Sequence, residues 1–251
     1  IKIAIDKDWS PIEFVTENGD YSGISKDYID KISNLLNIDF DGPKHLGWPV
    51  VLDMVKQHEL DLFPCVAQTP QREHFVNFTK PYLTFPWIIA AKTDVTFING
   101  VGALHGKTIA VVKGYAIHDL LSLHHPEINL HLVKNASEGL FSVHRGEIFA
   151  YVGNLAAVMS AIQNEGLANV KIAGNTGYHL KLRMAVRKDW PLLLGILQKA
   201  LDEISQEEQN QIYQKWIKLQ YVTGFDYKII WQGLAAVLFI MSLIIYWNRT
   251  L

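Results

Sequence analysis

The chain of 251 residues contains a single cysteine, Cys65, and few charges for its length. One cysteine excludes an internal disulfide and every zinc motif built from paired cysteines. Charged residues make up 19% of the chain and the formal net charge is −2, with no basic block. A nucleic-acid-binding surface therefore has no electrostatic basis. We expect Cys65 to be a small buried apolar group rather than a nucleophile.

Catalytic and metal-binding signatures are missing as well. The sequence has no Gly-x-Ser-x-Gly motif, no Walker loop and no zinc motif. Glu13 is the one acid that we can name as a candidate acid or base if the chain were an enzyme. We predict no catalytic residue and no cofactor. Four histidines lie close together in the sequence: His118, His124, His125 and His131. We interpret them as solvated helix histidines and predict no metal site.

The strongest positive feature is an uncharged run near the C-terminus. From residue 229 to residue 247 only Gln232 and Ser242 are strongly polar, and aromatic residues stand near both ends. A helix needs roughly 20 apolar residues to cross a bilayer, and aromatic rings favour its interfaces. The pattern predicts a transmembrane helix over residues 229–247. The alternative is a buried core helix.

The residues before this run predict an α/β fold. Hydrophobic residues make up 49% of the chain, as in globular proteins. Strand-like runs, such as residues 60–66 and 108–112, alternate with helix-like runs, such as residues 136–145 and 155–164. Two successive β-α-β runs favour two similar lobes. The chain begins without Met in a strand-like segment, so we expect it to be a piece of a longer polypeptide.

Several short motifs follow one another along residues 1–219. The motifs are Asp8-Trp9-Ser10-Pro11, Gly23-Ile24-Ser25-Lys26-Asp27, Leu60-Asp61-Leu62, Thr69-Pro70-Gln71-Arg72, Phe78-Thr79-Lys80-Pro81-Tyr82, Gly106-Lys107-Thr108 with the strand to Gly114, and Arg187-Lys188-Asp189-Trp190-Pro191. Their order and spacing resemble the type 3 bacterial extracellular solute-binding proteins, which bind amino acids and related small polar molecules. The segments 206–216 and 246–249 are similar to those of members fused to membrane sensors. These include histidine kinases of the BvgS and EvgS kind and diguanylate cyclases or phosphodiesterases.

The resemblance implies a two-lobe, Venus-flytrap fold with two crossovers between the lobes. We expect lobe 1 to comprise residues 1–91 and 184–225, and lobe 2 to comprise residues 92–183. The resemblance also implies that residues 1–225 are periplasmic and that residues 229–247 anchor the chain in the bacterial inner membrane. A cytoplasmic kinase or cyclic-dinucleotide enzyme would then follow residue 251.

A ligand site is expected between the lobes. Arg72 presents a planar donor fork suited to a carboxylate, and the resemblance gives it that role. Aromatic faces and a strand-to-helix turn could complete the site. Amino-acid-binding members usually carry an acid at the position of Asn154, which puts amino-acid specificity in doubt. The expected ligand-binding residues are Trp9, Trp48, Ala67, Thr69, Arg72, Lys113, Gly114, Tyr115 and Asn154.

These observations predict a small-molecule-sensing domain that signals by hinge closure. Its ligand would be a small carboxylate or an amino-acid-like molecule, and a homodimer is compatible with the sequence. Two alternatives remain open: a membrane-anchored solute-binding protein that serves a transporter, and a small-molecule lyase on the same fold.

Overall fold

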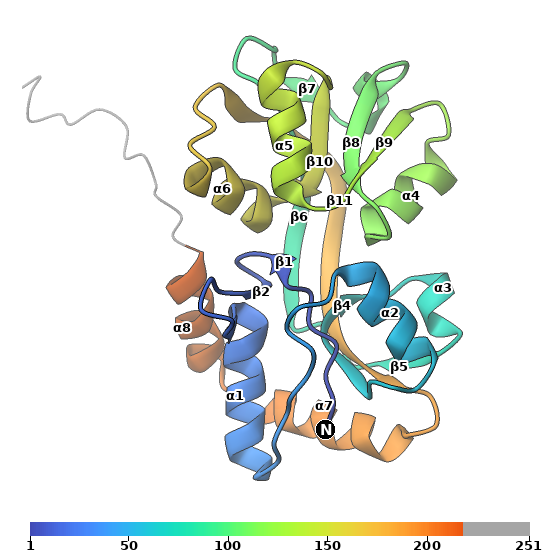
Figure 1. Cartoon of the computed structure of the whole chain (residues 1–251), viewed down its shortest axis with the longest axis vertical. Helices are drawn as coiled ribbons and strands as arrows, with labels where there is room; N and C mark the ends of the chain where they lie inside the picture. The colour runs from blue at the N-terminus through green and yellow to red at the C-terminus, as the bar shows by residue number, and fades with distance from the viewer. Residues whose placement is uncertain (218–251) are drawn as a thin grey trace, which may run out of the picture. The chain divides into compact units, whose positions relative to one another are not determined.

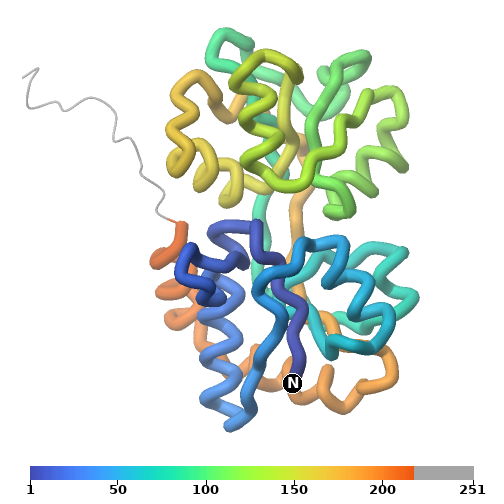
Figure 2. The backbone as a smooth tube through the Cα atoms, viewed as in Figure 1, coloured from blue at the N-terminus to red at the C-terminus, as the bar shows by residue number. Residues whose placement is uncertain are grey.

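The computed structural model describes residues 1–217, which form one unit of two α/β lobes (Figures 1 and 2). Lobe 1 contains β1 to β5 with α1, α2, α3, α7 and α8, and lobe 2 contains β7 to β10 with α4, α5 and α6. The strands β6 and β11 run through both lobes. The α/β class and the two-lobe architecture expected from the sequence are confirmed.

The strands form a three-stranded sheet, β1-β2-β3, and an eight-stranded sheet with the order β4-β11-β6-β10-β8-β9, which β5 and β7 join through β11. Their bounds are β1 Asp8–Trp9, β2 Glu13–Val15, β3 Tyr21–Ser22, β4 Leu62–Ala67, β5 Val76–Phe78, β6 Leu83–Lys92, β7 Ile98–Asn99, β8 Thr108–Val112, β9 Asn129–Val133, β10 Ala150–Asn154 and β11 Val170–Arg187. All six residues of β4 are buried, as expected for a strand that is covered on both faces.

The helices bury one apolar face each against these sheets. Their bounds are α1 Ile24–Leu36, α2 Trp48–Lys56, α3 Pro70–Glu73, α4 Ala116–His124, α5 Ala136–Arg145, α6 Leu155–Asn164, α7 Pro191–Glu203 and α8 Gln206–Trp216, with a short 3₁₀ helix, η1, at Val101–Leu104. In α1 the buried Ile24, Tyr28 and Ile32 recur at helical spacing. In α2 the same pattern buries Trp48, Val51 and Val55.

Both lobes share β6 and β11, which pair along most of their length. Residues 83–86 of β6 pair with β11 in lobe 1, whereas residues 87–91 also pair with β10 in lobe 2. The register of β11 shifts between Asn175 and His179, at the level where β6 gains β10 as a partner. The chain therefore passes between the lobes near Trp87 and near residues 175–179. The boundaries expected at residues 91 and 184 fall within these same two strands and stay a prediction.

Two local features mark the start of lobe 1. Gly23 holds the N-cap position of α1 with φ +120°, and a Cβ there would lie 2.6 Å from the Ile12 carbonyl oxygen. Ser25, a residue type that often caps helices, is buried in the first turn and donates to Glu13. The first six residues do not form a strand, since Lys2 and Ile3 make only isolated bridges to neighbouring segments.

The transmembrane helix expected over residues 229–247 lies outside the described residues. Among residues 1–217, no helix is both long enough and apolar enough to span a bilayer.

Candidate functional site

A small cavity lies between the two lobes. Five of the nine predicted site residues line it: Trp9, Trp48, Ala67, Arg72 and Tyr115. The first four come from lobe 1, and Tyr115 precedes α4 of lobe 2. The cavity holds about 20 Å³, which is room for one water molecule and far less than an amino acid needs. In this conformation the lobes are in direct contact around the cavity through side-chain hydrogen bonds.

Arg72 joins the lobes through main-chain carbonyl groups. It lies in α3, which begins at Thr69, whose hydroxyl accepts a hydrogen bond from the Arg72 backbone N–H. One terminal nitrogen of Arg72 donates to the Ala67 carbonyl oxygen at 2.7 Å, and the other donates to that of Gly114 at 3.0 Å. Burial lowers the pKa of Arg72 to about 10, so the guanidinium remains charged at neutral pH.

Trp48 supports the same contact. Its indole N–H donates to the Gly114 carbonyl oxygen at 3.2 Å, and its ring lies 5.1 Å from the Arg72 guanidinium. Gly114 has φ +76°, a conformation that residues with a Cβ rarely adopt. This turn places one carbonyl oxygen between two donors from the opposite lobe. The guanidinium also gains a cation–π contact with the indole.

A second connection across the cleft joins Tyr115 and Asp6. The Tyr115 hydroxyl donates to Asp6 Oδ2 at 2.6 Å, and the Tyr115 ring packs 5.4 Å from the ring of Trp9. Burial raises the pKa of Asp6 to about 6, while the bond from Tyr115 lowers it. Asp6 is the one acid among the residues that line the small cavity, and Arg72 is the one cation.

Glu13, the acid named from the sequence, is hydrogen-bonded to the backbone of Asp6. Burial raises its pKa to about 8, so it is mainly protonated at neutral pH. It accepts from the Asp6 backbone N–H at 2.7 Å, and the hydroxyls of Tyr21 and Ser25 donate to its other oxygen. Glu13 does not line the cavity. It therefore holds the Asp6 backbone in place and supplies no free carboxylate.

The remaining predicted residues lie outside the small cavity. Thr69 lines an adjoining groove of about 480 Å³, between α3 and α4, which is within the range of small-molecule sites. Lys113 is exposed. Asn154 is buried and caps α6, where its side-chain oxygen accepts from the Ala157 backbone N–H at 2.9 Å. The groove and the cavity share Ala67 as a wall, so they are adjacent parts of one cleft.

Sequence reasoning missed Asp6, Trp87 and Leu180 as residues of this cavity. Trp87 and Leu180 lie on β6 and β11 where these strands pass between the lobes, a position that depends on strand pairing. Asp6 ends the first apolar run and lies two residues before the Asp8-Trp9 motif. This position is the one local signal that could have indicated Asp6 as a site residue. Trp9 adds an unused donor, because its buried indole N–H has no acceptor among the described residues.

Comparisons with known proteins show which proteins the chain is similar to. The chain is 23% identical to the virulence sensor protein BvgS of Bordetella pertussis over 99% of this chain and 21% of BvgS, so it spans about a fifth of that relative. It is 29% identical to the probable amino-acid-binding protein YxeM of Bacillus subtilis over 76% of this chain and 74% of YxeM. A solved histidine kinase sensor domain similar to periplasmic binding proteins superposes with a TM-score of 0.80 at 21% identity, covering 87% of this chain and 96% of that one.

The family assignment follows from a match over most of the sequence. Residues 1–219 match the model of the bacterial extracellular solute-binding proteins, family 3. This range includes both lobes and every residue of the cleft described above. The resemblance noted in the sequence is thereby confirmed: the chain belongs to the family 3 bacterial extracellular solute-binding proteins.

Proposed function

We propose that residues 1–217 are the periplasmic small-molecule-sensing domain of a membrane-bound bacterial signalling protein. The observation that carries this proposal is the direct contact of the lobes at the cleft, where Arg72 and Trp48 donate to the Gly114 carbonyl and Tyr115 donates to Asp6. The similarity to BvgS supports a sensor rather than a carrier. Residues 229–247 would anchor the domain in the inner membrane, and a kinase or cyclic-dinucleotide enzyme would supply the output.

The ligand would be a small carboxylate that competes for Arg72. In the closed conformation the guanidinium is bound to carbonyl oxygens of both lobes, and a carboxylate is a stronger partner for it. Because the cavity holds only about 20 Å³, binding would require the lobes to move apart or the adjoining groove to take part. The ligand would change the output through its different affinity for the closed and separated lobes.

Amino acids would bind poorly through their ammonium group. Asn154 is neutral and already caps α6. Asp6 is the one acid in the small cavity, and its carboxylate already accepts from Tyr115. A buried ammonium without a carboxylate partner is costly. We therefore favour deaminated carboxylates over α-amino acids as ligands.

A thermal-shift screen tests this proposal. Residues 1–225 would be mixed with α-amino acids and, in parallel, with the 2-oxo and 2-hydroxy acids of the same side chains. A ligand of the native state raises stability by RT ln(1 + [L]/Kd), about 2.7 kcal/mol at a hundredfold excess over Kd. We expect stabilisation by the acids without the ammonium. Stronger stabilisation by the amino acids would overturn the ligand class.

The two alternatives are separated by different measurements. A binding protein that serves a transporter predicts no signalling domain after residue 251 in the full-length protein. A lyase predicts that the isolated domain converts its ligand, which a mass spectrum of the incubated mixture would reveal. We expect a signalling domain and an unchanged ligand.

A further inference from the structure

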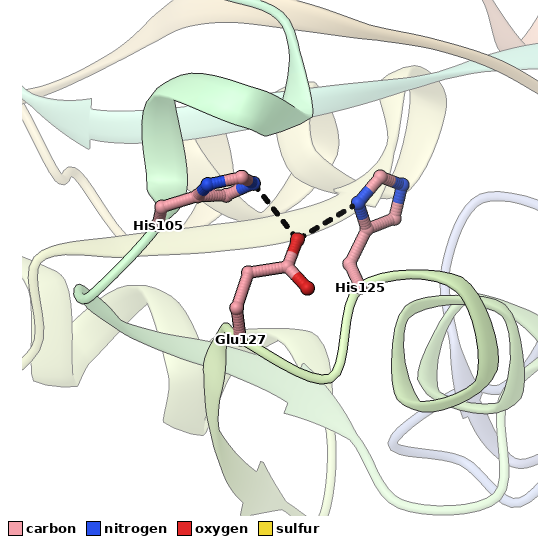
Figure 3. Close-up of side chains that lie close together, drawn as sticks. All are labelled: His105, His125 and Glu127. Atoms are coloured by element: carbon pink, nitrogen blue, oxygen red, sulfur yellow. Dashed lines mark hydrogen bonds and ion pairs between the residues drawn. The ribbon is translucent and has the colours of Figure 1, made fainter.

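A cluster of three metal-ligand side chains lies in lobe 2, outside the residues that line the small cavity and the adjoining groove. His105 follows η1, His125 follows α4, and Glu127 lies two residues before β9 (Figure 3). The backbone around them is fixed by the start of the β8–β9 pair, since the Asn129 N–H donates to the Lys107 carbonyl. Of the four histidines singled out in the sequence, only His125 belongs to this cluster, and His105 precedes all four in the chain.

The distances suit a divalent transition metal. Glu127 Oε1 lies 2.8 Å from His105 Nε2 and 3.3 Å from His125 Nδ1, and all three ligand atoms lie within 4.8 Å of one another. In a tetrahedral site with metal–ligand bonds of about 2.0–2.1 Å, neighbouring ligand atoms are roughly 3.3 Å apart. The contact between Glu127 and His125 already has this spacing, and the contact between Glu127 and His105 would lengthen by about half an ångström around an ion.

The second nitrogen of His125 is held by another side chain. His125 Nε2 lies 3.0 Å from the Tyr178 hydroxyl, and the two rings meet edge to face with centroids 6.0 Å apart. When Nε2–H donates to Tyr178, Nδ1 carries the lone pair that faces Glu127. Outer hydrogen bonds of this kind fix the tautomer and orientation of metal-binding histidines.

We propose that His105, His125 and Glu127 form a three-ligand site for Zn²⁺ or a similar divalent transition metal. Two imidazoles and a carboxylate suit such ions, whereas Mg²⁺ favours oxygen ligands alone. The side chains of His105, His125 and Glu127 are 55%, 20% and 39% exposed. Water can thus complete the coordination, and the ion can exchange with solvent. The alternative is an ion pair in which both histidines share the carboxylate without any metal.

Titration calorimetry of the 251-residue chain with ZnCl₂ tests the site, with MgCl₂ as the comparison ion. We expect one zinc ion per chain and no magnesium binding at the same concentrations. His105→Ala and Glu127→Gln should each weaken zinc binding at least tenfold. His124→Ala is the matched control, since His124 is adjacent to His125 but outside the cluster, and it should leave binding unchanged.

Cobalt(II) gives a spectroscopic readout that simple charge attraction would not produce. Tetrahedral Co²⁺ absorbs strongly in the visible range, and this absorption should appear with the wild type and be lost in His105→Ala. Circular dichroism would establish that each variant is folded. Equal zinc affinity in His105→Ala and the wild type, equal loss in His124→Ala, or no binding below millimolar zinc would each overturn the proposal.

Discussion

The guanidinium of Arg72 in lobe 1 donates a hydrogen bond of 3.0 Å to the main-chain carbonyl oxygen of Gly114 in lobe 2. A residue that the family resemblance assigns to ligand binding therefore also holds the lobes together. Any ligand that takes the guanidinium must replace this bond. The same residue would thus link ligand affinity to the position of the lobes.

Arg72→Ala should weaken binding of the carboxylate found in the screen by about tenfold or more. Loss of a charge-assisted hydrogen bond costs roughly 1.5–3 kcal/mol. Titration calorimetry would measure the affinity, and circular dichroism would establish that the domain is folded. Arg72→Lys keeps the charge but loses the planar donor fork, so its affinity for the carboxylate should lie between those of the wild type and Arg72→Ala. Unchanged affinity in Arg72→Ala would refute the assignment.

Tyr115→Phe should shift the domain toward separated lobes. The substitution removes the hydroxyl that donates to Asp6 across the cleft and keeps the ring that packs on Trp9. A bond to a charged group contributes about 1.5–3 kcal/mol, so the ratio of separated to closed domains should rise about tenfold or more. Small-angle scattering would detect a larger radius of gyration if separated lobes become abundant.

Tyr178→Phe is the control for that experiment, because its hydroxyl bonds His125 and not the opposite lobe. It should leave the radius of gyration unchanged. The Tyr115 bond also lowers the pKa of Asp6, so Tyr115→Phe should raise that pKa above its present value of about 6. A compact Tyr115→Phe domain whose Asp6 titrates as in the wild type would contradict a role for this bond.

Glu13→Gln should remove part of the pH dependence of stability. Burial raises the pKa of Glu13 from 4.5 to about 8, so between these values the folded domain holds a proton that the unfolded chain releases. The wild type therefore loses stability as the pH rises through this window. Glutamine resembles the protonated acid and retains an oxygen that can accept from the Asp6 N–H.

Urea denaturation at pH 5 and pH 9 would measure this effect. We expect the drop in unfolding free energy between the two pH values to be smaller in Glu13→Gln, by about 4 kcal/mol. Asp6 is present in both proteins, so the comparison isolates Glu13. The same drop in both proteins would mean that Glu13 titrates normally.

Asn154→Asp should allow α-amino acids to stabilise the domain. The substitution supplies the acid that amino-acid-binding relatives are expected to carry, and aspartate caps a helix as well as asparagine does. Asn154→Ala is the control, because it loses the cap of α6, at a cost of about 1 kcal/mol, without adding a charge. Thermal shifts with amino acids that are strong and equal in the wild type and Asn154→Asp would show that this position does not set specificity.

Local sequence patterns predicted the regular elements of lobe 2 well. The strand over residues 108–112 and the helices over residues 136–145 and 155–164 have the bounds that their apolar spacing indicates. The segments 170–173 and 180–186 each have a strand-like pattern and together form the single strand β11. Glycines at 174 and 177 interrupt the apolar pattern, but pairing with β6 continues on both sides through register shifts. Pairing with β6 therefore decides that these residues form one strand rather than two.

Site residues that lie in short sequence motifs could be predicted, whereas those that the chain topology brings to the site could not. Arg72 and Trp9 lie in recognisable motifs, whereas Trp87 reaches the cavity because β6 crosses between the lobes. The use of Arg72 as a connection between lobes depends on the turn at Gly114, which follows it by 42 positions. His105 likewise meets His125 only through the start of the β8–β9 pair. Such contacts depend on chain topology and leave no short-range pattern.

The shared strands β6 and β11 also bear on how the domain unfolds. Each strand contributes residues to both lobes, and the two remain paired from one lobe into the other. If one lobe loses its structure, it exposes the edges of strands that the other lobe still needs. Unfolding of the two lobes should therefore be cooperative. Calorimetry of residues 1–225 should show one heat-absorption peak with equal calorimetric and van't Hoff enthalpies.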